Sequence, residues 1–128
     1  MALPASMRRR GHRCFNRLHR SGRRHHGDWM VLRVMPEEPR LLRPELRRHP
    51  TRCCRCALVI SSKVSKRAVR RNRLRRLLHQ HLRQQLEHRG DLAGRWVLIS
   101  LRPEASEAEP SQLLEECDSL LSSAGLGQ

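Results

Sequence analysis

The residues of this chain with the clearest capacity for chemistry are a dense group of cations. Seven of the eleven residues from Lys66 to Arg76 are basic, and no acidic residue occurs between Glu45 and Glu87. Like charges at helical spacings of three and four repel one another unless an outside anion neutralises them. Because the planar guanidinium of arginine matches phosphate oxygens in pairs, the cluster predicts a nucleic-acid partner.

The charge distribution along the chain supports a polyanionic partner. The 128 residues carry 27 Lys and Arg against 12 Asp and Glu, a formal net charge of +15. Residues 1–100 hold 26 of these cations and 6 of the acids, whereas residues 101–128 hold one cation and six acids. We therefore place the polyanion-binding surface in the first hundred residues and expect the acidic stretch to avoid it.

Cysteine is the second candidate for chemistry. His49, Cys53 and Cys56 have the spacing of half a zinc site, but no second Cys-x-x-Cys or His-x-x-x-His pair follows. A strand with small buried cysteines is therefore the favoured interpretation. Five cysteines without regular spacing also argue against a disulfide framework and favour a reducing compartment.

Histidine is the third candidate. The pairs His25-His26 and His79-x-His81 have no neighbouring acid in the sequence to orient a base or a metal ligand, so we expect them at the surface or facing RNA. Paired carboxylates, a nucleophile with a base and a glycine-rich phosphate loop are all missing from the sequence. We predict no catalytic residue, no metal site and no bound cofactor in the protein itself.

The sequence shows no targeting or membrane segment. No run of about 18 apolar residues occurs, and no apolar segment follows the basic residues Arg8, Arg9 and Arg10 as a secretory signal requires. We expect a cytoplasmic protein with no membrane partner. A transit peptide is the less favoured alternative, because residues 1–27 are rich in arginine and contain no acid.

Hydrophobic patterns predict the elements that position the cations. A short helix is expected within 7–21, then strands at 29–35 and 54–61 on either side of a proline-rich loop at 36–50. Leu74, Leu78, Leu82 and Leu86 recur every fourth residue and predict a long helix over 66–88 with an apolar back and a cationic front. A strand at 95–101 and a helix at 111–123, with Ser111 as N-cap, follow.

This order of elements favours an α+β fold, a small two-layer α/β sandwich. The strands on either side of the long helix are expected to be parallel. The apolar run at 57–60 is typical of a strand buried on both faces. We expect one RNA-binding domain over 1–123 and a short flexible tail at 124–128.

The segment 61–77, SSKVSKRAVRRNRLRRL, resembles the signature of the bacterial ribonuclease P protein subunit. In that family an apolar strand leads through a Ser-Lys-Lys-Val-like exit to Arg-Asn-Arg, an apolar residue, two basic residues and leucine. The Arg-Asn-Arg motif is matched by Arg71, Asn72 and Arg73. The similarity covers roughly residues 3–123, including an upstream helix around Phe15 and a downstream strand at 96–103.

The chain also departs from the family pattern. His19 stands where an aromatic residue is frequent, Ser62 stands where lysine is common, and the sequence contains no tyrosine. With few aromatic rings, binding of single-stranded RNA should depend more on cations than on base stacking.

The resemblance implies a left-handed βαβ crossover around the long helix, against the usual handedness. It implies a ribonucleoprotein endonuclease, a hydrolase that removes the 5′ leader from precursor tRNA, with catalysis and Mg²⁺ in the RNA subunit. No protein partner is predicted. The residues expected to bind the RNA subunit are Lys63, Lys66, Arg67, Arg70, Arg71, Asn72, Arg73, Arg75 and Arg76. Those expected in a leader cleft between the first helix and the sheet are Phe15, Arg17, Arg20, Trp29 and Arg33.

Two other classes of nucleic-acid-binding protein share some of these features. A structural ribosomal-type RNA-binding protein with no role in cleavage is equally small and basic, and it remains the alternative. A DNA-binding helix module needs two short helices around a tight turn, whereas a strand precedes the long helix here.

Overall fold

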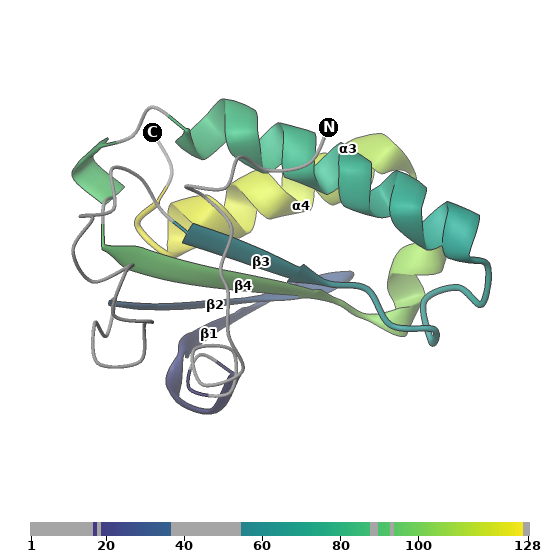
Figure 1. Cartoon of the computed structure of the whole chain (residues 1–128), viewed down its shortest axis with the longest axis horizontal. Helices are drawn as coiled ribbons and strands as arrows, with labels where there is room; N and C mark the ends of the chain where they lie inside the picture. Colours follow the sequence, from purple (N-terminus) through teal and green to yellow (C-terminus); the bar gives the residue numbers. More distant parts are fainter. Residues whose placement is uncertain (1–16, 18, 37–54, 88–89, 93, 127–128) are drawn as a thin grey trace, which may run out of the picture.

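The computed structural model describes residues 17, 19–36, 55–87, 90–92 and 94–126. One layer is a four-stranded sheet in the order β1-β2-β4-β3, and the other consists of the helices α3 and α4 (Figure 1). The elements in chain order are β1 (Arg23–His26), β2 (Met30–Pro36), β3 (Arg55–Val59), α3 (Ala68–Leu86), the 3-10 turn η3 (Gly90–Leu92), β4 (Arg95–Leu101), the 3-10 turn η4 (Pro103–Glu107) and α4 (Pro110–Ser123). This mixed arrangement confirms the predicted α+β class.

The hydrophobic core lies between the two layers. Alternate residues of the antiparallel strands β2 and β4 face the helices, so that Leu32 lies opposite Ile99 and Val34 lies opposite Val97. Leucines spaced three and four apart on α3 and α4 cover them, because those spacings place side chains on one side of a helix. The buried helix residues are Leu78, Leu82, Leu86, Leu113, Cys117, Leu120 and Leu121.

Helix α3 has the predicted two-faced character but begins later than expected. Lys66 and Arg67 belong to the preceding loop, and Arg67 is the N-cap residue. Leu74 is half-buried at the edge of the core, and Arg71 and Arg75 are half-buried as well. The solvent side of the first half of α3 therefore carries the cations.

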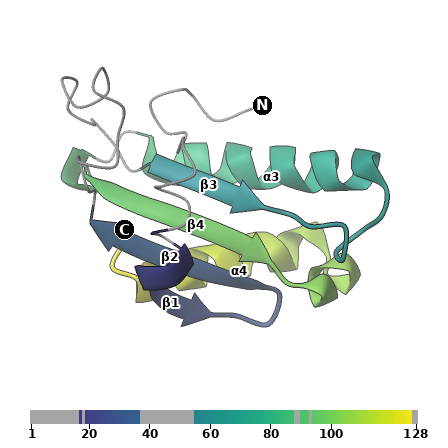
Figure 2. The same cartoon turned by 60° about the horizontal axis from the view of Figure 1, so that its bottom comes forward.

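The connection from β3 through α3 to β4 is left-handed. The two strands are parallel neighbours, with Cys56 opposite Val97 and Leu58 opposite Ile99, which confirms the predicted parallel pair. In Figure 2 both strands point to the right, β4 lies below β3, and α3 lies behind the sheet. This hand is the reverse of nearly all such crossovers and agrees with the implication of the resemblance.

The predicted burial of β3 on both faces is wrong. Residues Ala57, Leu58 and Val59 are only half-buried, because β3 pairs with β4 alone and forms an edge of the sheet. The strand β1 at the other edge was not predicted. Its sequence, Arg-Arg-His-His, has no apolar residue to indicate a strand, and only its antiparallel pairing with β2 defines it.

The start of α4 also differs from the prediction. The N-cap is Glu109 and not Ser111: the Glu109 carboxylate accepts from the backbone of Gln112, and the Gln112 side chain accepts from the backbone N–H of Glu109. Pro110 occupies the first turn, where a backbone N–H has no acceptor within the helix, so no hydrogen bond is lost with proline. Past the end of α4, Leu126 is buried and its N–H donates to the Leu121 carbonyl at 2.8 Å, so packing continues beyond the expected boundary at 123.

The structure also corrects the prediction for His81. Its Nε2 atom lies 2.7 Å from Asp118 Oδ1, so an acid from α4 does orient this histidine between the two helices. The expectation of a surface or RNA-facing His81 without an acidic neighbour is therefore wrong, because the acid lies 37 residues away in the sequence. Cys56 is buried on β3, whereas His49 and Cys53 lie outside the described residues.

The turn between β1 and β2 is fastened to α4. The Glu116 carboxylate accepts hydrogen bonds from the backbone N–H of Asp28 and of Trp29, the latter at 2.9 Å. A Cβ atom at position 27 would overlap this carboxylate in its present position, so a larger residue would displace the Glu116 side chain from the turn. One carboxylate thus joins the acidic helix to the hairpin at the edge of the sheet.

Candidate nucleic-acid interface

The loop at 61–67 places cations directly after β3. Its backbone is held by Ser61 and Ser65, whose Oγ atoms accept from the N–H groups of Lys63 and Arg67 at 3.3 Å each. Val64 is buried and anchors the middle of the loop in the core. These local hydrogen bonds of serine fix the conformation from which Lys63, Lys66 and Arg67 extend into solvent.

Three arginines of the predicted RNA-binding set are engaged within the protein. Arg71 Nη1 donates to the Ser65 carbonyl at 2.7 Å, and Arg75 Nη1 donates to Asn72 Oδ1 at 3.1 Å. Arg70 reaches across to donate to the Ser106 carbonyl in η4. The first two are also half-buried, so part of their hydrogen-bonding capacity supports the fold.

The remaining cations of the set project freely. Lys63, Lys66, Arg67, Arg73 and Arg76 are exposed, and among the described residues none of their side chains has a hydrogen bond or an ion pair. The structure brings them together on the loop and on the solvent side of the first half of α3. We call Lys63, Lys66, Arg67, Arg73 and Arg76 the cationic surface. Such a set of unneutralised charges fits the phosphates of a nucleic acid.

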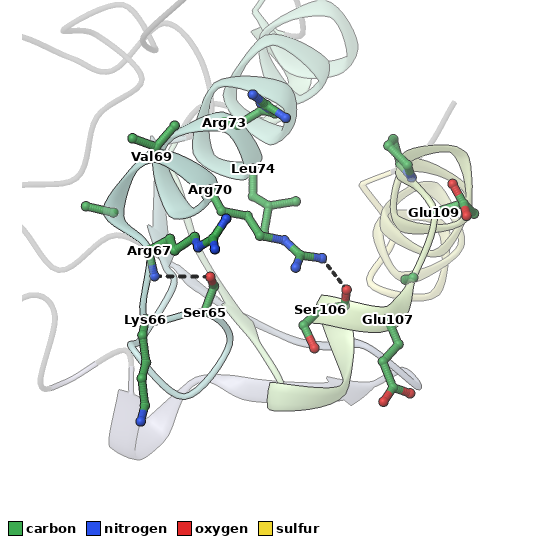
Figure 3. A pocket seen from close by; sticks show the side chains of 13 residues that line it. Ser65, Lys66, Arg67, Val69, Arg70, Arg73, Leu74, Ser106, Glu107 and Glu109 are labelled. Carbon is green, nitrogen blue, oxygen red and sulfur yellow. Dashed lines mark hydrogen bonds between the residues drawn. The ribbon is translucent and has the colours of Figure 1, made fainter.

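A groove borders the cationic surface (Figure 3). It is open, measures about 1160 Å³, and lies between the start of α3 on one side and η4 with the start of α4 on the other. Lys66, Arg70 and Arg73 line the first wall, and Glu107 and Glu109 line the second. The lining residues without charge are Ser65, Ala68, Val69, Leu74, Ser106, Ala108 and Pro110.

The face of the sheet that points away from α3 and α4 is a second cationic region. Arg33 lies on this face of β2, directly opposite Arg24 of β1. Burial and the charge of Arg24 lower the pKa of Arg33, whose Nε atom is buried without an acceptor in the described part of the chain. The nearest partner of its guanidinium is Ser100 Oγ, at 3.4 Å from Nη1. Arg24 was missed from the sequence because only the register of the unpredicted β1 places it here.

The predicted leader residues do not all share this face. The helical turn containing Arg17 and Arg20 ends at Ser21 and lies on the same side of the sheet as Arg33 (Figures 1 and 2). Trp29 instead packs against the core on the helix side. Phe15 lies outside the described residues. The structure therefore brings Arg17, Arg20 and Arg33 to one side and separates Trp29 from them.

The described residues lack two further features, a metal-binding cluster and a membrane-spanning helix. No group of three or more His, Cys, Asp and Glu side chains that could hold a metal ion occurs among them. Within the same residues no helix combines the length and the apolar character needed to cross a membrane.

Comparison with known proteins places the chain in a family. A family model described as Ribonuclease P matches residues 3–125. The chain is 98% identical over 128 residues, all of both chains, to a ribonuclease P protein component of Parasynechococcus marenigrum, and 75% identical over 98% of each chain to that of a Synechococcus species. Its fold is similar to RNase P proteins of Staphylococcus aureus (TM-score 0.73, 16% identity, covering 95% and 98% of the two chains) and Thermotoga maritima (TM-score 0.68, 20% identity, covering 91% and 96%). The loop, the motif-bearing helix and these matches agree: the chain belongs to the Ribonuclease P protein family.

Proposed function

We propose that this chain is the protein subunit of a ribonuclease P holoenzyme, an RNA-binding cofactor in the endonucleolytic removal of the 5′ leader from precursor tRNA. The observation that carries the proposal is the cationic surface, five exposed cations without an acidic partner among the described residues, in a chain of this family. Its partners are the RNA subunit and the 5′ leader of the substrate.

The RNA subunit binds at the cationic surface. Lys66 and Arg67 at the end of the loop and Arg73 and Arg76 on α3 each contribute a charge to phosphates of the folded RNA. Three other arginines hold the loop and the start of the helix in place through hydrogen bonds within the protein: Arg70, Arg71 and Arg75. Asn72 is exposed between Arg71 and Arg73, and its Oδ1 atom orients Arg75.

The leader binds on the far face of the sheet. Arg17, Arg20 and Arg33 supply its phosphate contacts, and Phe15 supplies a ring for base stacking. Trp29 has no part in this assignment, because it packs against the core on the opposite side. The repulsion between the exposed Arg24 and the partly buried Arg33 is relieved when a leader phosphate lies between the two guanidinium groups.

The hydrolytic step belongs to the RNA subunit, which binds Mg²⁺. Magnesium prefers carboxylate and phosphate oxygens, whereas the cationic surface offers guanidinium and ammonium groups that repel it. The donors of this surface therefore do not fit a magnesium site of the protein's own. The chain's contribution is to hold RNA, orient the leader and neutralise phosphate charge.

Reconstitution tests the proposal. The protein is combined with a bacterial ribonuclease P RNA at low Mg²⁺, and leader release from a precursor tRNA is followed on a gel. We expect cleavage to rise sharply over that of the RNA alone, and the protein alone to cleave nothing. RNA binding without any stimulation of cleavage would overturn the proposal in favour of a structural RNA-binding protein.

A matched pair of variants connects the activity to the cationic surface. Arg73→Gln and Arg95→Gln each remove one exposed positive charge. Arg95 is the first residue of β4. The loop at 61–67 lies at the other end of the parallel pair β3 and β4. Stimulation of cleavage should fall with Arg73→Gln and persist with Arg95→Gln. Equal loss with both variants would mean that only net charge matters.

A further inference from the structure

The groove beside the cationic surface has walls of opposite charge, which a surface that binds only phosphates does not need. Its α3 wall carries Lys66, Arg70 and Arg73, and its opposite wall carries the carboxylates of Glu107 and Glu109. In Figure 3 Lys66 and Glu107 extend from opposite walls toward the same side of the groove, and the Leu74 side chain points between the walls. A ligand for this groove combines an anionic group, an apolar plane and a hydrogen-bond donor.

Only one of the two carboxylates is available to a ligand. Glu109 is occupied, because its side chain accepts from the backbone of Gln112 in the capping box of α4. Glu107 is exposed and has no hydrogen bond or ion pair with any described residue. On the cationic wall, Arg70 is already bonded to the Ser106 carbonyl, which leaves Lys66 and Arg73 for an anion.

We propose that this groove binds an unpaired guanosine nucleotide of the RNA subunit. Lys66 and Arg73, whose side chains extend in opposite directions from the α3 wall (Figure 3), contact the phosphates on its two sides. The base lies against the apolar side chains of Leu74, Ala108 and Pro110, and Glu107 accepts hydrogen bonds from the base edge. Guanine presents two adjacent donors, N1–H and N2–H, that match a carboxylate, whereas adenine presents no such pair. The proposal rests on the proposed function, since the nucleotide belongs to the RNA that the cationic surface binds.

The groove favours a nucleotide over a peptide because its cationic wall is continuous with the cationic surface. Lys66, Arg67 and Arg73 both line the groove and form part of that surface. A nucleotide that leaves a paired region can enter the groove while its neighbours stay on the cations. A duplex cannot do so, because its base edges are occupied by pairing.

The sign of a charge effect tests the proposal. The variant Glu107→Gln removes one negative charge from the groove. The matched control Glu104→Gln removes one negative charge from η4 outside the groove. Electrostatics alone predicts equal or tighter binding of the RNA subunit for both. We expect Glu104→Gln to follow that rule and Glu107→Gln to weaken binding about fivefold. Tighter or unchanged binding with Glu107→Gln would overturn the proposal and leave Glu107 as a boundary of the RNA surface.

Titration with mononucleotides tests the groove assignment independently of the rest of the proposed function. Guanosine 5′-monophosphate, adenosine 5′-monophosphate and ribose 5-phosphate are titrated into the full chain, and amide shifts of residues 65–74 and 106–110 are followed by NMR. The guanine nucleotide should bind about fivefold tighter than the other two, and Glu107→Gln should abolish this preference. Equal binding of all three ligands, or no shift in these residues, would overturn the groove assignment even if reconstitution succeeds. Guanine preference without stimulation of cleavage would instead overturn the proposed function alone.

Discussion

At the scale of single residues, arginines that are neighbours in the sequence have different surroundings. Arg71 is half-buried and donates to the Ser65 carbonyl, whereas Arg73, two residues later, is exposed and has no partner among the described residues. Two residues along a helix turn the side chain through about 200°. One arginine of the motif therefore supports the loop, and the other faces solvent on the surface that we propose binds RNA.

The salt dependence of RNA binding distinguishes these two roles. Arg73→Gln removes a phosphate contact, so it should weaken binding of the RNA subunit by about 1–3 kcal/mol and reduce the slope of log K against log salt by about 1. Arg71→Gln should weaken binding through a loosened loop and leave the slope unchanged. Filter binding at several salt concentrations measures both quantities, and equal slope changes in the two variants would contradict the distinction.

Arg33 is held at a cost to stability. Its Nε atom is buried and has no acceptor among the described residues, and Arg24 lies opposite with the same charge. Arg33→Met removes both penalties and keeps the stem of the side chain, so it should stabilise the free protein by about 1 kcal/mol, which corresponds to a rise in Tm of about 3–5 °C. Calorimetry measures this change.

The same variant should impair the proposed leader contact. In assembled holoenzyme, Arg33→Met should weaken binding of leader-bearing precursor tRNA and spare mature tRNA. A lower Tm, or equal loss for both tRNAs, would show that Arg33 supports the fold instead.

Cys117 gives the fold a pH dependence at alkaline pH. Burial, with smaller contributions from Asp118 and Glu116, raises the pKa of this thiol to about 12. The unfolded chain loses the proton near pH 9, so the folded state becomes relatively less stable as pH rises from about 9 toward about 12. By pH 10 the loss attributable to Cys117 should be about 1 kcal/mol. Urea unfolding at pH 7 and 10 should show a smaller decline in Cys117→Ala, and identical declines would refute the assignment.

At the scale of elements, α4 stabilises the sheet through Glu116 and its apolar side. Glu116 holds the β1–β2 turn through two backbone N–H groups, and the apolar side of the helix covers β2. Glu116→Gln should therefore lower stability by about 1–2 kcal/mol, because an amide replaces a charged acceptor. Thermal unfolding is the measurement, and RNA affinity of the folded protein should change little. Unchanged stability with altered RNA affinity would contradict this view of α4.

The elements also show what could be predicted from the sequence. Repeated leucines specify α3, and the apolar runs specify β2, β3 and β4, because each pattern has the period of its element. The capping box at Glu109 was missed because serine is the stronger N-cap by residue type. The helix begins two residues earlier, with Pro110 at its first position. Strand β1, the pair Arg24–Arg33 and the contact between His81 and Asp118 depend on register and packing between distant segments, which local patterns do not contain.

At the scale of the whole molecule, the charge asymmetry along the sequence becomes a separation in space. The cationic surface lies on the loop and on α3, while η4 and α4 carry exposed carboxylates at the far side of the groove. The surface that we propose binds RNA therefore has an acidic border. This arrangement limits the area over which phosphates can bind.

The concentrated charge should make assembly strongly dependent on salt. About six phosphate contacts at roughly 0.7 released ions each give a log-log slope of about −4 for binding of the RNA subunit. Binding isotherms between low and physiological salt measure this slope. A slope shallower than about −1.5 would mean that few phosphates are touched and that the cationic surface has another role.

The edge strand β1 has a consequence for the protein before it meets RNA. An exposed edge offers unpaired backbone groups to a strand of another copy, which is a route to aggregation. All four residues of β1 are arginine or histidine, so a second copy approaching this edge brings like charges together. The short cationic strand thus keeps newly made copies of the chain apart until a polyanion arrives.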